Sequence, residues 1–151
     1  MKRTYVFLAV AVATAASAAT IASAQKSLPA AHSSAAATVQ LRHTNLGSIL
    51  VSSSGRTLYE FTRDHVNKNS CAAIPGCSAV WPSLKANGRP TAGSGIKASL
   101  LSTTSGSQVT YAGHPLYTYS RDSGPGKTSY VGVKQFGGAW YAVNAAGDTV
   151  K

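Results

Sequence analysis

The sequence of 151 residues predicts an all-β fold: a small antiparallel β domain of two pseudo-equivalent, hairpin-containing repeats with one or two short helical turns. Two observations support this fold class. The stretch LYEFTRD, which begins at Leu58, recurs as LYTYSRD from Leu116, 58 positions later. Both copies alternate their side chains with the period of two that is typical of a β-strand. A single hairpin cannot bury its apolar face alone, whereas two copies can cover each other.

Each copy is expected to form a hairpin with the apolar run that precedes it. The runs SILVSSSG and SQVTYAG lead into the two copies, and Gly55 and Gly113 stand where the chain must turn. Repeat one is predicted over residues 47–84 and repeat two over residues 107–147. A third hairpin is expected in AWYAVNAAGDTV, with its turn at residues 144–147.

Period two places aromatic side chains and one arginine of each copy on a single strand face. These side chains are Tyr59, Phe61 and Arg63 in the first copy, and Tyr117, Tyr119 and Arg121 in the second. Alternating aromatics suit a half-buried strand, so we expect the rings to pack in the core with two anchors, Trp81 and Trp140. Exposed rings would instead offer a platform for sugars. Helical turns are expected only around residues 78–80 and 97–101.

The first 24 residues have the features of a cleaved export signal. Lys2 and Arg3 precede an alanine-rich apolar stretch, and residues 22–24 (ASA) fit the small-x-small pattern read by signal peptidase. Residues 25–37, rich in Ala and Ser, are predicted to be a disordered tether, and residues 38–151 a single β domain. No cysteine lies near the cleavage point, so we expect a secreted or periplasmic protein without a lipid anchor.

Cys71 and Cys77 are the two cysteines of the chain. In an exported protein they are most simply one disulfide that closes a short loop. A zinc site would need further Cys or His ligands at suitable spacing, and the histidines show no such spacing. We therefore expect no metal site and no cofactor.

The mature chain is strongly basic. Two of the fourteen Lys and Arg residues leave with the signal, so twelve remain against four acidic residues, a net charge of +8. The basic residues are scattered rather than clustered in a run, and export also argues against a nucleic-acid partner. Solubility alone explains such a charge; the functional alternative is an anionic envelope polymer or membrane surface.

Asp64 and Asp122 close the two copies and are the residues best suited to chemistry. Their simplest role is structural, because an aspartate at a strand end commonly accepts N–H bonds from the following turn. Alternatively, the symmetry of the repeats brings both carboxylates into one site that binds a cation or acts as an acid–base pair. Arg63 and Arg121 could pair with a carboxylate of the other copy or lie across the rings.

The string Tyr-x-aromatic-x-x-Asp, present from Tyr59 to Asp64 and from Tyr117 to Asp122, resembles the bacterial secreted repeat family of predicted lipoproteins with a Yx(FWY)xxD motif. CSAVWPSL after the first copy and FGGAWYAV near the end support the resemblance. It implies an exported protein and no established activity. The chain departs from the family in lacking the cysteine that would carry a lipid anchor.

No catalytic constellation is visible, since the chain has no Gly-x-Ser-x-Gly elbow and its cysteines are expected to be oxidised. The sequence therefore favours a non-enzymatic binding or structural module of the cell envelope, with no catalytic residues. Two alternatives stay open: a carboxylate-pair hydrolase of envelope glycans, and a metal-handling or electron-transfer protein. The sequence does not determine the oligomeric state.

Overall fold

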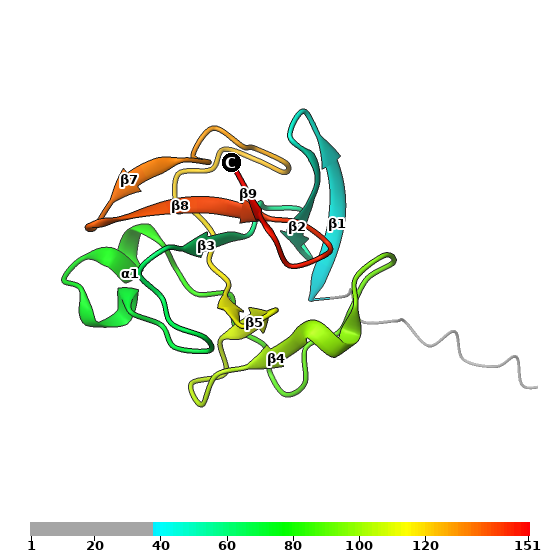
Figure 1. Ribbon diagram of the computed structural model, residues 1–151, viewed down its shortest axis with the longest axis horizontal. Coiled ribbons are helices and arrows are strands. Elements are labelled where there is room, and N and C mark those ends of the chain that lie inside the picture. Colours follow the sequence, from blue (N-terminus) through cyan, green and yellow to red (C-terminus); the bar gives the residue numbers. More distant parts are fainter. Residues whose placement is uncertain (1–37) are drawn as a thin grey trace, which may run out of the picture. The chain divides into compact units, whose positions relative to one another are not determined.

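Residues 38–151 are described by the structure, a computed structural model, as short strands with brief helical turns (Figure 1). The predicted export signal and tether lie outside the described residues. The strands are β1 (Val39–Thr44), β2 (Gly47–Ser52), β3 (Tyr59–Phe61), β4 (Leu101–Thr103), β5 (Val109–Tyr111), β6 (His114–Pro115), β7 (Val133–Gln135), β8 (Gly138–Val143) and β9 (Thr149–Val150). The helical turns are η1 (Cys71–Ala73), α1 (Cys77–Val80) and η2 (Ala98–Leu100).

The strands form three small antiparallel sheets in the described part of the chain. β1 pairs with β2, and β4, β5 and β6 form a second sheet in that order. The third sheet has the order β3-β8-β7, and β9 also pairs with β8. The predicted all-β fold class is therefore confirmed.

All three predicted hairpins are present. Gly55, with a φ of 79°, lies in the turn that follows β2. After this turn Thr57 forms a bridge with Val51 of β2, and the chain then enters β3. Gly113, with a φ of 86°, lies in the tight turn between β5 and β6. β8 and β9 are joined by the turn at residues 144–147. The two expected helical turns are α1 and η2, whereas η1 was not expected.

The two copies of the repeated stretch meet at their tyrosines. The N–H of Tyr59 donates to the carbonyl of Tyr117, and the N–H of Tyr117 donates to the carbonyl of Tyr59, each at 2.9 Å. In an antiparallel bridge, directly opposite residues send their side chains to the same face. The duplicated sequence thus pairs with itself and brings both tyrosine rings to one side.

The second copy is not the continuous strand that its alternation predicts. β6 ends at Pro115, and of the residues that follow only Tyr117 forms bridges. The reason is that the backbone divides its bonds among several segments. Leu116 donates to Val109, Tyr117 to Tyr59, and Thr118 to Pro82. No single neighbouring strand is therefore available to form a ladder.

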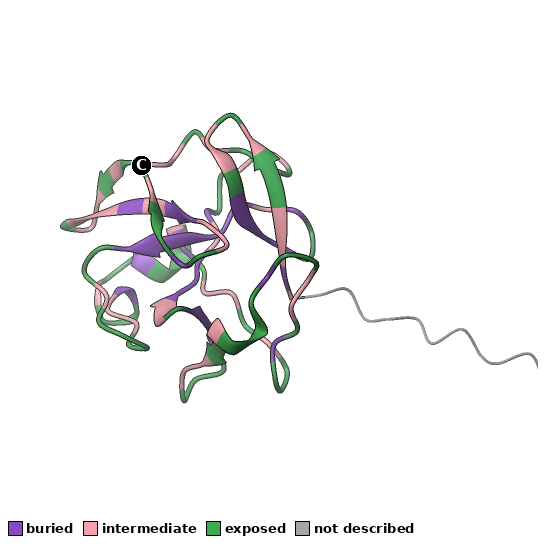
Figure 2. Ribbon diagram, turned by 45° about the vertical axis from the view of Figure 1, so that its right-hand side comes forward, coloured by how far each residue is buried: buried purple, intermediate pink, exposed green. Residues whose placement is uncertain are grey.

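The expectation of a half-buried strand is also wrong, because both faces of the first copy are buried (Figure 2). Tyr59 and Phe61 belong to an aromatic cluster that includes the disulfide, whereas Leu58 belongs to a separate aliphatic cluster. Glu60, on the same face as Leu58, is only 4% exposed. The sequence concealed this burial because one of the covered positions carries a charge.

Candidate functional site

The repeated motifs bind each other through their tyrosines and aspartates. The Tyr117 hydroxyl donates to Asp64 Oδ2 at 2.7 Å, and the Tyr59 hydroxyl donates to Asp122 Oδ2 at 3.3 Å. Each tyrosine therefore contacts the aspartate of the other copy. The first and last residues of the Tyr-x-aromatic-x-x-Asp string are joined across the molecule rather than within one copy.

The second oxygen distinguishes the two carboxylates. Asp64 Oδ1 accepts the backbone N–H of Ser70 at 2.7 Å, as expected for an aspartate that holds the chain after a strand end. Asp122 Oδ1 is buried and has no hydrogen-bond partner in the described residues. The predicted turn bond is thus formed by Asp64 and not by Asp122.

Burial controls the titration of these four side chains. Desolvation raises the pKa of the Asp64 carboxyl, although the Ser70 N–H and the Tyr117 hydroxyl partly oppose the rise. Desolvation likewise raises the pKa of the Asp122 carboxyl, against the Tyr59 hydroxyl and Arg56. The pKa values of Tyr59 and Tyr117 are raised far above their usual range, first by burial and then by the neighbouring carboxylate.

The two aspartates have different neighbours. Asp64 is surrounded by Ser70, Tyr117 and His65, and Asp122 by Tyr59 and Arg56. In residues 38–151 the hydrogen bonds of the two carboxylates go to different residues, so the fold pairs each aspartate with the tyrosine of the other copy rather than with the other aspartate.

The aromatic side chains form a buried stack around the two tryptophans. The rings of Trp81 and Trp140 lie parallel, with centroids 3.9 Å apart and an interplanar angle of 2°. Tyr59 meets Trp81 edge-on at 5.2 Å, and Tyr117 meets Trp140 edge-on at 5.1 Å. Two more rings of the motifs cover the outer faces of the stack: Phe61 of the first copy lies on Trp140, and Tyr119 of the second copy lies on Trp81.

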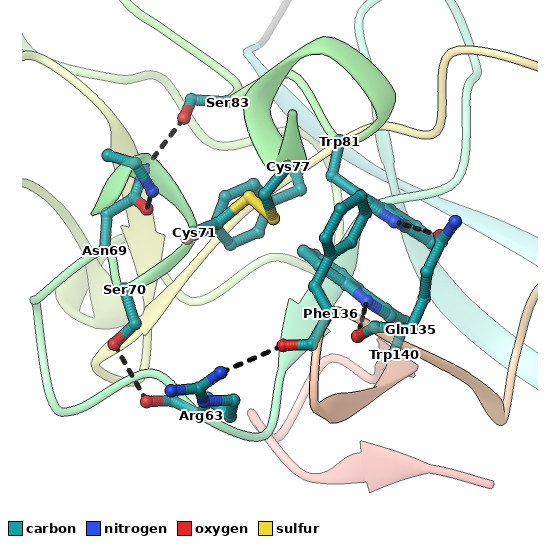
Figure 3. Close-up of a disulfide and its surroundings, with 12 residues drawn as sticks. Arg63, Asn69, Ser70, Cys71, Cys77, Trp81, Ser83, Gln135, Phe136 and Trp140 are labelled. Atoms are coloured by element: carbon teal, nitrogen blue, oxygen red, sulfur yellow. Dashed lines mark hydrogen bonds between the residues drawn. A yellow bond between two sulfur atoms is a disulfide. The ribbon is translucent and has the colours of Figure 1, made fainter. Parts of the chain in front are cut away.

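These rings do not provide a surface for sugars. Tyr59, Tyr117 and both tryptophans have no exposed area, and Tyr119 is 6% exposed. Gln135 satisfies the indole N–H groups, since its side-chain oxygen accepts from Trp81 at 2.9 Å and its backbone carbonyl accepts from Trp140 at 3.4 Å (Figure 3). The core interpretation of the aromatics therefore fits the structure.

Residues 99–144 match the family described as a secreted repeat of unknown function. The chain carries a secreted repeat. The matched segment contains Tyr117, Tyr119, Asp122 and Trp140, so the resemblance inferred from the motif is confirmed for the second copy. No curated protein and no solved structure matches the chain.

The two cysteines of the chain are joined. Cys71 and Cys77 form a disulfide that is completely buried in the aromatic cluster, close to Trp81 (Figure 3). The disulfide and the family indicate an exported protein. In the described residues no helix is long and apolar enough to cross a membrane.

The predicted arginines do not pair with the aspartates. Arg63 is exposed and donates to the carbonyl of Phe136 at 3.0 Å, and Arg121 is also exposed. A different arginine, Arg56, lies near Asp122 and donates to the carbonyl of Tyr119. Arg56 stands two residues before Leu58, and the equivalent position in the second copy is His114, so the identical letters of the repeat did not point to it.

Sequence reasoning also missed an ion pair between the repeats. His114 Nδ1 lies 2.5 Å from Glu60 Oε2, and the Thr149 hydroxyl donates to Glu60 Oε1. The Glu60 hydrogen bond raises the pKa of His114, although desolvation opposes the rise. No group of three His, Cys, Asp or Glu side chains within residues 38–151 is arranged to hold a metal ion.

Proposed function

We propose that this protein is a non-enzymatic binding module of the bacterial cell envelope, exported by a cleaved signal peptide without a lipid anchor, and that its partner is an anionic envelope polymer. The observation that carries the proposal is the separation of charge in the folded domain. Negative charge is directed inward, whereas positive charge remains on the surface.

The acidic side chains are mostly engaged inside the fold. Glu60 is bonded to His114 and Thr149, Asp64 to Tyr117 and Ser70, and Asp122 to Tyr59. Asp148 is the exposed exception and bonds to the side chain of Asn144. The surface therefore presents little negative charge that could repel a polyanion.

The exposed basic side chains of residues 38–151 have no carboxylate partners. The ion pair of His114 with Glu60 is the one present there, and Arg56, which lies near Asp122, is not exposed. The exposed basic residues are Arg42, Arg63, Lys68, Lys85, Arg89, Lys97, Arg121, Lys127, Lys134 and Lys151. Unpaired surface cations attract a polyanion from a distance and bind it through several weak contacts.

The repeated motif supports a non-enzymatic role. Its tyrosines and aspartates bond to each other, and its aromatic rings are buried. The residues with the greatest chemical capability therefore maintain the fold. This leaves the surface, rather than an internal site, to carry the function.

Binding of the mature protein to polygalacturonate, with neutral dextran as the control, tests the proposal. We expect binding to polygalacturonate that weakens steeply as salt is raised, and no binding to dextran. Equal retention by both polymers, or binding that is insensitive to salt, would contradict the proposal. Binding to phosphatidylglycerol vesicles in place of the polymer would also contradict it and would identify a membrane partner.

A further inference from the structure

The geometry points to a preformed groove between Lys68 and Lys85 as the subsite for one anionic, hydroxyl-bearing sugar unit of a polyanionic glycan. This inference rests on the proposed function and locates it on one face. The groove is an open depression of about 700 Å³ between the loop after β3, residues 82–85, and the β4–β5 turn.

The lining combines positive charge with hydrogen-bonding groups. Lys68 and Lys85 supply two cations, and no acidic side chain lines the groove. The hydroxyls of Ser78, Thr104 and Ser105 and the amide of Asn67 can bond sugar hydroxyls, while lysine ammonium groups bind carboxylate or phosphate as point charges. A neutral sugar would not use the lysines, and a plain inorganic anion would not use so many hydroxyls.

A network of side-chain amides holds the floor of the groove. The Asn69 amide donates to Gln108 Oε1 at 2.7 Å and to Ser83 Oγ at 3.1 Å, the latter bond being visible in Figure 3. The Asn69 oxygen accepts the backbone N–H of Ala72 at 2.8 Å. Gln108, which is 3% exposed, donates to the carbonyl of Leu116 at 3.0 Å. The floor is thus fixed before any ligand arrives, which lowers the entropic cost of binding.

The disulfide holds one wall. Ala72 and Ser78 both line the groove, and each directly follows a cysteine of the Cys71–Cys77 pair. The opposite wall, at residues 104–108, comes from the segment leading into the second copy. Both copies and the disulfide therefore shape this site, although none of the repeated motif residues lines it.

Two double variants of equal charge test the location. Lys68→Gln/Lys85→Gln removes the groove cations, and Lys97→Gln/Lys134→Gln removes two exposed cations from outside the groove. We expect the first pair to weaken binding to polygalacturonate roughly fivefold to tenfold and the second pair to have a clearly smaller effect. Equal losses would overturn the groove while leaving the proposed function intact. Absence of binding by the unaltered protein would overturn both.

A second experiment, which leaves the charge of the protein unchanged, distinguishes a specific binding site from a general attraction by nearby lysines. In NMR titrations with a short oligogalacturonate, the side-chain amide resonances of Asn69 and Gln108 should shift and saturate, with an affinity weaker than that of the polymer, which makes additional contacts. Asn69→Ala, which keeps every charge, should lower that affinity if its melting shows a folded protein. Unmoved amide resonances at saturation would overturn the inference, whether or not the Asn69 variant folds.

Discussion

At the residue scale, the two aspartates occupy equivalent sequence positions but have unequal bonding. Asp64 accepts two bonds of 2.7 Å, whereas Asp122 accepts one of 3.3 Å and has a second oxygen that is buried without a partner. A buried polar atom without a hydrogen-bond partner lowers the free energy of unfolding, and so does the removal of a side chain whose hydrogen bonds are well formed. Identical letters in the motif therefore have different energetic consequences.

This asymmetry predicts different losses for two matched substitutions. Asp64→Ala leaves the Tyr117 hydroxyl and the Ser70 N–H without their acceptor, so we expect a loss of about 1–3 kcal/mol in unfolding free energy. After Asp122→Ala, Tyr59 retains the Lys127 carbonyl as an acceptor at 3.3 Å, so the loss should be smaller than about 1 kcal/mol. Denaturant unfolding of both variants measures the difference. Equal losses would show that the bonds of Asp64 contribute no extra stability.

The tyrosines predict the behaviour of the protein at alkaline pH. Burial and the neighbouring carboxylates raise the pKa of Tyr59 and Tyr117 in the folded state, so ionisation favours unfolding. Stability should be unaffected by these groups below about pH 10, the usual tyrosine pKa, and should decline as pH rises above it. Tyrosinate absorbance and circular dichroism should show that both side chains ionise only as the fold is lost.

At the element scale, the β7–β8 hairpin brings its turn tightly against the end of β3. Its turn residues Phe136 and Gly137 both have positive φ, at 58° and 78°. A positive φ is unfavourable for a bulky residue, and the packing of Phe136 against the aromatic cluster compensates for it. The first residue of β8, Gly138, lies directly beside Phe61 and Arg63.

A methyl group at Gly138 should therefore disturb the core. A Cβ there would lie 2.6 Å from the Phe61 ring and 2.9 Å from Arg63 Cγ, so Gly138→Ala should lower stability by about 1–3 kcal/mol. Gly124→Ala is the matched control, because a Cβ at that position meets no atom within 4 Å and the glycine φ is not positive. Thermal melting compares the two. A neutral effect of Gly138→Ala would mean that β8 moves away from β3 without cost.

At the scale of the whole molecule, the Glu60–His114–Thr149 contact joins β3, β6 and β9 from separate parts of the chain. The contact could not be predicted from the sequence, because Glu60 occupies a polar position of the alternation and His114 lies 54 positions away. The contact buries a glutamate that the alternation alone would place in water.

Its pH dependence is a further prediction. The Glu60 bond raises the pKa of His114 in the folded state, so the histidine contributes stability fully below its unfolded pKa of about 6.5. That contribution is lost as pH rises through the raised folded pKa. Unfolding free energies from pH 6 to 9 should therefore decline for the natural protein and be flatter for His114→Gln. Parallel curves would rule out the ion pair as a source of pH dependence.

The sequence by itself determined the all-β class, the hairpin turns, the disulfide and the family, because glycine turns, aromatic alternation and cysteine number are local or compositional properties. Its division into signal, tether and domain stays a prediction. Only the tertiary structure decided which partner each motif residue takes. Tyr59 bonds to Asp122 and not to Asp64, which is nearer along the chain, and Tyr117 bonds to Asp64. The physical reason is that the tyrosines pair across an antiparallel bridge, and partners in such a bridge are set by packing in space rather than by distance along the chain.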